Sequence, residues 1–399
     1  MEKGLISVDR WAEGSEAYFL THLHSDHTNG LTSTWSHGPL FCSSVTAKLL
    51  PFKIPGFDLS LLRILHPGTS HILTLSSTVL HVTVIDACHV PGSIMLLFRG
   101  DFGCVLHTGD FRWEATCQRA TDARHMLGHA LQNLPVVDIL YLDNTYSNPI
   151  YDFSPRHAAA QKVIDIISSH PDHEVIIGMN TLGKEDLLVE ISQRLRTMYL
   201  LGYPDIFTTN TSLTRVRAVP QYSFSIETLE ALNTMCPTIG ILPSGKWGAN
   251  SEAEIGDQVG NIGSPEKIHE YMYTVPYSDH SNYKEIEEFI KFVQPTRLKG
   301  IVASSSCYIE PMYYFGRLCC VDQQTQPLDG EQKRKESCKR EREEAVSSKA
   351  SFRGDNVQTG KERSKALKRR FSGVRVSRFS ILRRTHRGTK LRRNSSDEE

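Results

Sequence analysis

One short stretch limits what this chain can fold into more than any other: residues 17–30 read AYFLTHLHSDHTNG. A short apolar run ends there, and three histidines and an aspartate follow within six positions, namely His22, His24, Asp26 and His27. Imidazole and carboxylate groups are common ligands of transition-metal ions in proteins. The chain must therefore fold so that several metal-ligating groups meet where a strand stops.

The spacing within this cluster predicts two half-sites. At the end of a β-strand, His22 and His24 would point to the same side, because side chains alternate with a period of two. Asp26 and His27 would then lie in the turn that follows. We expect the first pair to serve one metal ion and the second pair to serve its neighbour.

Two further strand ends offer residues that could complete these half-sites. VIDACHVPGS places His89 just before a Pro-Gly turn, and VLHTGDF places Asp110 after an apolar run. A carboxylate can bridge the two ions of a two-metal site, which lie about 3.5–4 Å apart. The pattern thus predicts one ion held by four side chains and a second held by three: His22, His24, His89 and Asp110, and Asp26, His27 and Asp110.

Length and composition set the outer limits. The 399 residues suggest two or three domains, and no apolar run reaches the length of a membrane span. The N-terminal residues lack the apolar stretch of a secretory signal. The nine cysteines show no paired CxxC spacing, which favours free thiols in a reducing compartment over a disulfide framework.

The net charge of zero hides a division of charge along the chain. Residues 331–399 contain 22 Lys and Arg residues against 10 Asp and Glu residues, a net charge of +12, so the remainder carries −12. Apolar residues also become sparse after about residue 322. We expect residues 322–399 to form a disordered basic tail.

Apolar periodicity predicts a change of architecture near residue 140. Residues 5–110 alternate short apolar runs with turn residues, which indicates sheet with few helices. The later chain alternates strands and helices, which indicates a largely parallel sheet. The expected strands and helices are, respectively, 4–9, 17–23, 39–43, 71–86, 92–100, 104–110, 136–146 and 173–181, and 43–51, 154–171, 183–202 and 281–295.

Several motifs carry a resemblance to a known family. THLHSDH, DACHVPGS and HTGDFR resemble the signatures of the metallo-β-lactamase fold. ISVDRW, YLDNTYSNP, NTLGKE and VPYSDHSNY resemble more narrowly the β-CASP DNA nucleases, the group that contains Apollo and Artemis and, within it, the Apollo-like 5′ exonucleases. The resemblance runs from about residue 5 to about residue 303.

The resemblance implies an α/β fold, a metallo-β-lactamase αββα sandwich with an inserted β-CASP α/β domain and a disordered basic tail. We expect the sandwich over residues 1–145 and 276–321, the inserted domain over 146–275 and the tail over 322–399.

The resemblance also implies roles for individual residues. Asp9 would orient a metal-binding histidine, and Asp143 would lie at the metal site facing the substrate phosphate. His280 would be either a ligand of the second ion or the group that protonates the leaving oxygen. Asp26, Asp143, His280 and Asp9 are the expected catalytic set. Loop groups would hold a terminal phosphate, with these candidates: Thr145, Lys184, Ser281 and Ser244.

The implied activity is zinc-dependent hydrolysis of DNA from the 5′ end, with one or two Zn²⁺ ions per chain activating water and stabilising charge on the phosphate. Val302 stands where RNA-processing relatives carry a histidine, which favours DNA. The expected substrate is a 5′-phosphorylated end, single-stranded or frayed. The basic clusters 333–342 and 365–370 predict a nuclear address, non-specific attraction to DNA, or both.

Nuclear repair proteins are the expected partners, in repair of interstrand cross-links, double-strand breaks or telomere ends, and no membrane association is expected. Three alternatives remain: an RNA-processing endonuclease, a non-catalytic assembly subunit, and a hydrolase of small lactams or thioesters. The intact ligand set argues against the subunit, and Asp143 and His280 argue against the small-molecule hydrolase.

The sequence departs from the family pattern in three places. Cys88 precedes His89 where relatives carry Asn or His, and we expect it to pack rather than to bind metal. Compared with relatives, we expect the chain to be short of one strand after the helix near residue 192. Residues 246–267 are polar and rich in glycine, and we expect them to form a surface loop.

Overall fold

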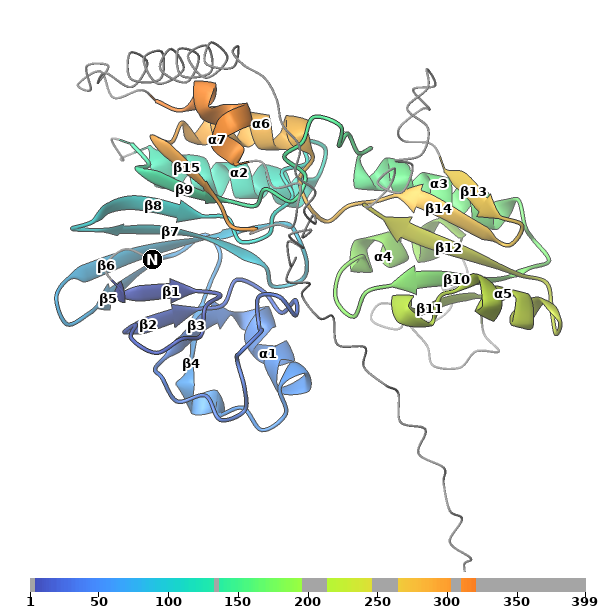
Figure 1. Cartoon of the computed structure of the whole chain (residues 1–399), viewed down its shortest axis with the longest axis horizontal. Coiled ribbons are helices and arrows are strands. Elements are labelled where there is room, and N and C mark those ends of the chain that lie inside the picture. The colour runs from blue at the N-terminus through green and yellow to red at the C-terminus, as the bar shows by residue number, and fades with distance from the viewer. Residues whose placement is uncertain (1–3, 133–135, 196–213, 246–264, 303–309, 321–399) are drawn as a thin grey trace, which may run out of the picture. The chain divides into compact units, whose positions relative to one another are not determined.

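The computed structural model describes residues 4–132, 136–195, 214–245, 265–302 and 310–320. Within these ranges the strands form three sheets, of four, six and five strands. The third sheet comes from the segment between β9 and β15, which are neighbours in the second sheet (Figure 1). The predicted tail lies outside the described residues.

The first sheet has the order β1-β2-β3-β4, and its strands are parallel. Helix α1 follows directly on β3, and the Ser43 hydroxyl caps it by accepting from the Thr46 amide. The elements of this part are β1 Ile6–Val8, β2 Ala17–Phe19, β3 Leu40–Ser43, α1 Ser44–Lys53, the 3₁₀ helix Leu59–Leu61 and β4 Leu62–Leu65.

The second sheet has the order β15-β9-β8-β7-β6-β5. Strands β5 to β8 are antiparallel, whereas β9 and β15 extend the sheet in parallel. Its strands are β5 Ser70–Thr74, β6 Val79–Asp86, β7 Ile94–Gly100, β8 Gly103–His107, β9 Ile139–Leu142 and β15 Arg297–Gly300. Its helices are α2 Gln118–Leu131, α6 Tyr283–Val293, α7 Pro311–Phe315 and the 3₁₀ helix Gly316–Leu318.

These two sheets pack face to face with helices on both outer sides. Phe19 of the first sheet contacts Phe98 of the second, with ring centroids 5.0 Å apart, inside a shared apolar core. Leu50 of α1 packs on the outer face of the first sheet, and Phe289 of α6 packs in the core of the second. The layers therefore run α, β, β, α, as predicted for the sandwich.

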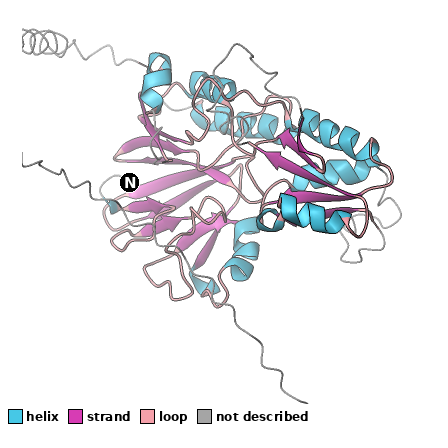
Figure 2. Ribbon diagram, turned by 45° about the vertical axis from the view of Figure 1, so that its right-hand side comes forward, coloured by secondary structure: helices cyan, strands magenta, loops and turns pink. Residues whose placement is uncertain are grey.

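The third sheet has the order β11-β10-β12-β14-β13, with only β13 antiparallel. Helices α3 and α4 share one apolar core with it, and α5 packs in another (Figure 2). Its elements are α3 Arg156–Ser168, β10 Glu174–Met179, α4 Glu185–Leu195, β11 Val216–Pro220, the 3₁₀ helix Gln221–Ser223, α5 Ile226–Asn233, β12 Thr238–Ser244, β13 Glu266–His269 and β14 Met272–Pro276.

Helix α6 shows why its segment folds as it does. Asn282 caps it in a reciprocal capping box with Glu285, and Gln294 ends it in a left-handed conformation just before Pro295. The four apolar residues at helical spacing are all buried: Ile286, Phe289, Ile290 and Val293. The loop 277–282 therefore enters a helix that is fixed on the second sheet.

The structure corrects several sequence predictions. Residues 71–86 form a hairpin of two strands, β5 and β6, because Ser76 and Ser77 interrupt the run. Helices α2 and α5 and strands β11, β12 and β14 were not predicted. Of the helix expected over 183–202, the described part is α4, and residues 196–202 lie outside the described residues. Strand β13 begins inside the segment that was expected to be a loop. The supposed missing strand and most of that loop lie outside the described residues.

The predicted domain boundaries stay predictions, although the third sheet comes wholly from residues between them. Among the residues that the structure describes, no helix has both the length and the hydropathy needed to span a membrane.

Candidate metal centre

The histidine cluster lies in a loop and not on the strand that precedes it. Strand β2 ends at Phe19, so the predicted alternation of His22 and His24 along a strand is wrong. The loop is instead folded back on itself, because the amide and the hydroxyl of Thr28 both donate to the His24 carbonyl, at 3.1 and 2.9 Å. This turn brings His27 back beside His22, with ring centroids 4.1 Å apart.

Two neighbouring loops supply the other residues. His89 follows β6, and its amide donates to the Ser93 hydroxyl at 3.1 Å. Asp110 follows β8 after Gly109, whose φ of 53° and close approach to Thr21 leave no room for a side chain: a Cβ there would lie 2.9 Å from the Thr21 Cβ. Glycine thus allows the Asp110 loop to touch the histidine loop.

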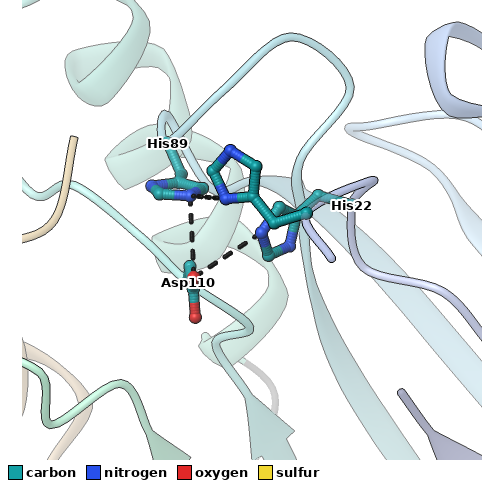
Figure 3. Close-up of side chains that lie close together, drawn as sticks. His22, His89 and Asp110 are labelled. Carbon is teal, nitrogen blue, oxygen red and sulfur yellow. Dashed lines mark hydrogen bonds and ion pairs between the residues drawn. The ribbon is translucent and has the colours of Figure 1, made fainter. Parts of the chain in front are cut away.

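These loops bring the predicted ligands together in three groups that share Asp110. Within each group one ligand atom per residue lies within 4.8 Å of the others. The groups are His22, His24, His89 and Asp110; Asp26, His27 and Asp110; and Asp110, Asp143 and His280. His22, His89 and Asp110 converge in Figure 3.

Asp110 presents its two oxygens to two different groups. Its Oδ2 lies 3.5 Å from His22 Nε2 and 3.6 Å from His89 Nε2. Its Oδ1 lies 3.2 Å from His27 Nε2. The carboxylate is 4% exposed. A side chain so placed has the geometry of a bridge between two cation sites.

Hydrogen bonds outside the cluster fix the orientation of the imidazoles. His27 Nδ1 donates to Asp9 Oδ2 at 2.7 Å. His22 Nδ1 lies 3.0 Å from the Thr21 hydroxyl, which itself donates to Asp9 Oδ2 at 2.7 Å. His89 Nδ1 donates to the Asp279 carbonyl at 2.8 Å. In each ring Nε2 is left facing the cluster, an arrangement typical of metal-binding histidines.

One contact in particular fits a metal ion. His24 Nε2 donates to the Leu182 carbonyl at 3.1 Å, so a neutral His24 carries its lone pair on Nδ1. By the same reasoning a neutral His89 carries its lone pair on Nε2, and these two nitrogens are 3.1 Å apart. Two facing lone pairs at that distance require a cation or a shared proton between them.

Burial supports the metal reading. Desolvation first, and then neighbouring histidines, hold the pKa values of His22 and His89 well below the usual value, so both rings are neutral. His22 Nε2 and Asp110 Oδ1 are buried and make no hydrogen bond within the described residues. Neutral imidazole nitrogens and a carboxylate form a donor set that suits divalent transition metals. These residues form a candidate metal-binding site.

His27 differs from its neighbours. Burial opposes its charged form, but the carboxylates of Asp110 and Asp9 raise its pKa to about 11. Asp26, the third member of its group, has a side chain that is 79% exposed and lies 3.7 Å from His27 Nε2. This second group is therefore more open to solvent than the first.

Asp143 and His280 form a pair at the third group. His280 Nδ1 donates to Asp143 Oδ2 at 2.8 Å, and the His280 ring lies 4.6 Å from the His89 ring. Burial lowers the pKa of His280, but the charge and hydrogen bond of Asp143 outweigh it and raise the value to about 9. The pKa of Asp143 is held below its usual range, since His280 and Thr145 offset the effect of burial.

The four candidate phosphate-binding residues are placed differently from one another. Thr145 donates to Asp143 Oδ1 from both its amide and its hydroxyl, at 3.0 and 2.6 Å. The Ser281 hydroxyl is buried, accepts from the Trp113 amide and donates to the Phe111 carbonyl, so a phosphate cannot reach it. These two residues fix loops, which corrects the expected role of Ser281.

Lys184 and Ser244 keep a position compatible with the prediction. Lys184 precedes α4 with a φ of 67°, and its ammonium lies 3.8 Å from Asp279 Oδ2. The residue is only 8% exposed, so it is not an ordinary surface lysine. Ser244 ends β12, and its carbonyl accepts from the Tyr277 amide. Whether either one binds phosphate stays a prediction.

Sequence reasoning missed several residues that hold the site together. Thr21 links His22 to Asp9, and Asp279 links His89 to the loop of His280. Both lie inside motifs quoted above, one position from a predicted ligand. Cys88 has a φ of 56°, is buried in the apolar core and belongs to none of the ligand groups found among the described residues, consistent with the packing role expected of it.

The first two sheets form an αββα sandwich, and its histidine and aspartate loops gather at one site. A second α/β unit interrupts the sandwich in sequence. This architecture is of the metallo-β-lactamase type. A sequence profile described as DNA repair metallo-beta-lactamase matches residues 203–306.

Three similar proteins illustrate the relationship. The 5′ exonuclease Apollo of Danio rerio is 38% identical over 325 residues, which are 77% of this chain and 52% of that protein. The protein of the same name from Gallus gallus is 38% identical, over 76% and 63% of the two chains. DNA cross-link repair protein SNM1 of Arabidopsis thaliana is 32% identical, over 72% and 60%. The chain thus spans between half and two thirds of each relative.

Proposed function

We propose that this protein is a zinc-dependent 5′-to-3′ exodeoxyribonuclease that acts in DNA repair. The observation that carries the proposal is the facing pair of lone pairs on His24 and His89, beside a buried Asp110 whose two oxygens face two ligand groups. Relatives named as 5′ exonucleases and as cross-link repair proteins support the class of substrate.

Zinc is the metal that the donor set favours, because structural and catalytic zinc sites combine imidazole nitrogens with carboxylate oxygens. Four ligands with little exposure form the first group, whereas the second has three and includes the exposed Asp26. One tightly held ion and one weaker ion per chain follow from this difference. Bound zinc would supply an activated water and would stabilise negative charge on the phosphate.

The residues of the chain contribute orientation and proton control. Asp110 is proposed to hold both ion positions at a fixed separation, and Asp9 to orient His27 from outside the ligand group. Asp143 holds the His280 ring by Nδ1, which turns the opposite nitrogen away from Asp143. That nitrogen is proposed either to bind the second ion or to give a proton to the leaving oxygen.

DNA is preferred over RNA as the substrate because of Val302. This residue exchanges two hydrogen bonds with Asn144, since its amide donates to Asn144 Oδ1 at 3.0 Å and its carbonyl accepts from Asn144 Nδ2 at 3.3 Å. It is therefore held by the residue that follows Asp143, and it stands at the position where RNA-processing members of the resembled group carry a histidine. A nuclear location and nuclear repair partners are proposed from the basic tail clusters.

The test is digestion of end-labelled single-stranded DNA by the purified full chain. We expect stepwise shortening from a 5′-phosphorylated end, slower cleavage of a 5′-hydroxyl end, loss of activity on chelation and recovery with Zn²⁺. RNA of the same sequence is the matched control. Cleavage of RNA in preference to DNA, or activity that survives complete metal removal, would overturn the proposal.

A further inference from the structure

A buried network of charged side chains lies behind the candidate metal centre. Arg112 and Glu114 follow the Asp110 loop, Arg156 begins α3 and Glu285 lies in the first turn of α6. The Arg112 side chain is fully buried, and the Glu114 and Arg156 side chains are 5% and 11% exposed. Buried charges are expensive unless they are paired, so these groups must have a reason to be there.

Arg112 forms hydrogen bonds with the backbone of the loop that carries His280. Its Nη1 donates to the carbonyls of Ser278 and His280, at 2.9 and 3.3 Å, and its Nε pairs with Glu285 at 2.9 Å. The carbonyl between those two, that of Asp279, accepts from His89. Three successive carbonyls of one loop are therefore held by a guanidinium and by a predicted ligand.

Arg156 forms a hydrogen bond with the backbone of the loop that carries His89. Its Nη2 donates to the Cys88 carbonyl at 2.6 Å, on the residue that immediately precedes His89. Cys88 has a φ of 56°, a conformation that a residue other than glycine rarely adopts without support. The hydrogen bond to its carbonyl supplies such support.

Glu114 joins the two guanidinium groups. Its Oε2 lies 3.3 Å from Arg156 Nε and 3.7 Å from Arg112 Nη2, and its Oε1 accepts from the Arg156 amide at 3.1 Å. None of Arg112 Nη2, Arg156 Nε and Glu114 Oε2 forms a hydrogen bond in the described part of the chain. The charge of Glu114, more than any hydrogen bond from Oε2, balances the two cations.

We infer that Glu114 is a positioning residue for the metal centre, acting through Arg112 and Arg156 on the loops of His280 and His89. The inference rests on the proposed metal-dependent function. Residues that orient metal ligands from outside typically change metal affinity or activity about 10- to 100-fold when they are altered. Without the negative charge, Arg112 would keep its pair with Glu285, and Arg156 would keep, among the described residues, only the largely exposed Asp186, 3.9 Å from its Nη1. The hold of the two guanidinium groups on both loops would then loosen.

The test is titration of the full-length, metal-free protein with Co²⁺, followed by its visible absorption, for wild type and for Glu114→Gln. Glutamine keeps the shape and one acceptor but removes the charge. We expect Co²⁺ binding at least about tenfold weaker, at a temperature where circular dichroism shows both proteins folded. Glu288→Gln is the matched control, because it breaks the surface pair with Arg124 at 3.0 Å and should leave Co²⁺ affinity unchanged.

A lower unfolding temperature with wild-type Co²⁺ affinity would show a purely structural role and overturn the inference. If Glu114→Gln does not fold, Arg156→Lys decides, since lysine keeps the cation but cannot reproduce the planar fork of donors. Wild-type affinity in that variant would also overturn the inference. Absence of Co²⁺ binding by wild-type protein would instead defeat the proposed metal centre, so the two failures are distinguishable.

Discussion

The two sides of the candidate metal centre satisfy their polar atoms in opposite ways. On the side of His22, His89 and Asp110, buried ligand atoms lack hydrogen bonds within the described residues, and lone pairs face one another. On the side of Asp143 and His280, the Asp143 carboxylate accepts from Thr145, from His280 and, at 3.3 Å, from the Phe111 amide. In this sense the first side is incomplete, because its buried ligand atoms lack hydrogen-bond partners in the part of the chain that the structure describes. The second is complete, because the Asp143 carboxylate has them.

The difference has an energetic meaning. A buried polar atom without a partner costs roughly 1–3 kcal/mol, and clustered lone pairs add repulsion. An ion on the first side removes these costs, so folding and metal binding should be coupled there. The Asp143 side gains no such relief, and its residues are free to serve the reaction. The predictions below test this division of roles, from the largest expected effect to the smallest.

The largest effect is expected for Asp110→Asn. The change keeps the shape of the side chain but removes the charge that faces two ligand groups, so both ion positions are weakened at once. We expect a loss of at least about 10³-fold in rate, the scale seen when one key electrostatic stabiliser is deleted. The measurement is single-turnover cleavage of a 5′-phosphorylated oligonucleotide at matched zinc.

Asp101→Asn is its control, because Asp101 is exposed and, among the residues that the structure describes, accepts a hydrogen bond only from Thr78, at 2.9 Å. Its rate should equal that of wild type. Comparable rates for the two variants would exclude Asp110 as a bridge and would leave the histidines of the first side holding one ion alone.

The second prediction separates the two sides directly. His24→Ala should remove the tight ion, lowering metal affinity by about 10²-fold or more, because a ligand is worth at least as much as its outer partners. Asp143→Asn should lower activity but keep that ion, since Asp143 belongs only to the third group. Elemental analysis after gel filtration measures the metal content. Equal loss of metal from both variants would show that the two sides are one site.

The third prediction concerns Asp9, which touches the first side from behind. Asp9→Asn leaves an acceptor for the Thr21 amide but weakens the charged hydrogen bond to His27. We expect metal affinity or activity to fall about 10- to 100-fold, less than for loss of a ligand. Metal competition with a coloured chelator measures the affinity. An unchanged affinity would mean that His27 is oriented by Asp110 and packing alone.

The same contrast separates what the sequence could predict from what it could not. The ligands of the first side lie in short motifs, so His22, His24, His89 and Asp110 could be proposed from residue type and order, and the structure gathers them. The stated reason failed for His22 and His24, because local apolar character does not show where β2 stops pairing. The strand ends at Phe19, and the loop that follows it, rather than the alternation of side chains along a strand, brings the histidines together.

The residues missed act over long sequence separations. Arg156 donates to the Cys88 carbonyl, and Arg112 donates to the Ser278 carbonyl. Every residue has a backbone carbonyl, so residue types alone cannot predict these contacts. Ser281 was misread for a related reason. A serine beside a functional histidine looks available, yet its hydroxyl bonds to the backbone at both Trp113 and Phe111. Side-chain type predicts chemistry, whereas burial decides whether a substrate can reach it.

The smallest effect is expected for Thr145→Val, on the complete side of the site. Valine has nearly the same shape but cannot donate from its side chain, so Asp143 Oδ1 loses one of two bonds from this residue and keeps the amide bond. A hydrogen bond to a charged group contributes about 1.5–3 kcal/mol, and a neighbouring donor offsets part of that loss. We expect kcat to fall by less than about tenfold, equally for 5′-phosphorylated and 5′-hydroxyl DNA.

Thr78→Val is the matched control, since it deletes a threonine-to-aspartate bond at the surface and should leave kcat unchanged. The two substrates decide what Thr145 does. If Thr145 only steadies Asp143, the loss is the same with either 5′ end, because the phosphate never contacts the hydroxyl. A loss confined to the 5′-phosphorylated substrate, with a raised KM, would mean that the hydroxyl turns from Asp143 to the phosphate. The Asp143 side would then be incomplete too, with substrate as the missing partner in place of metal.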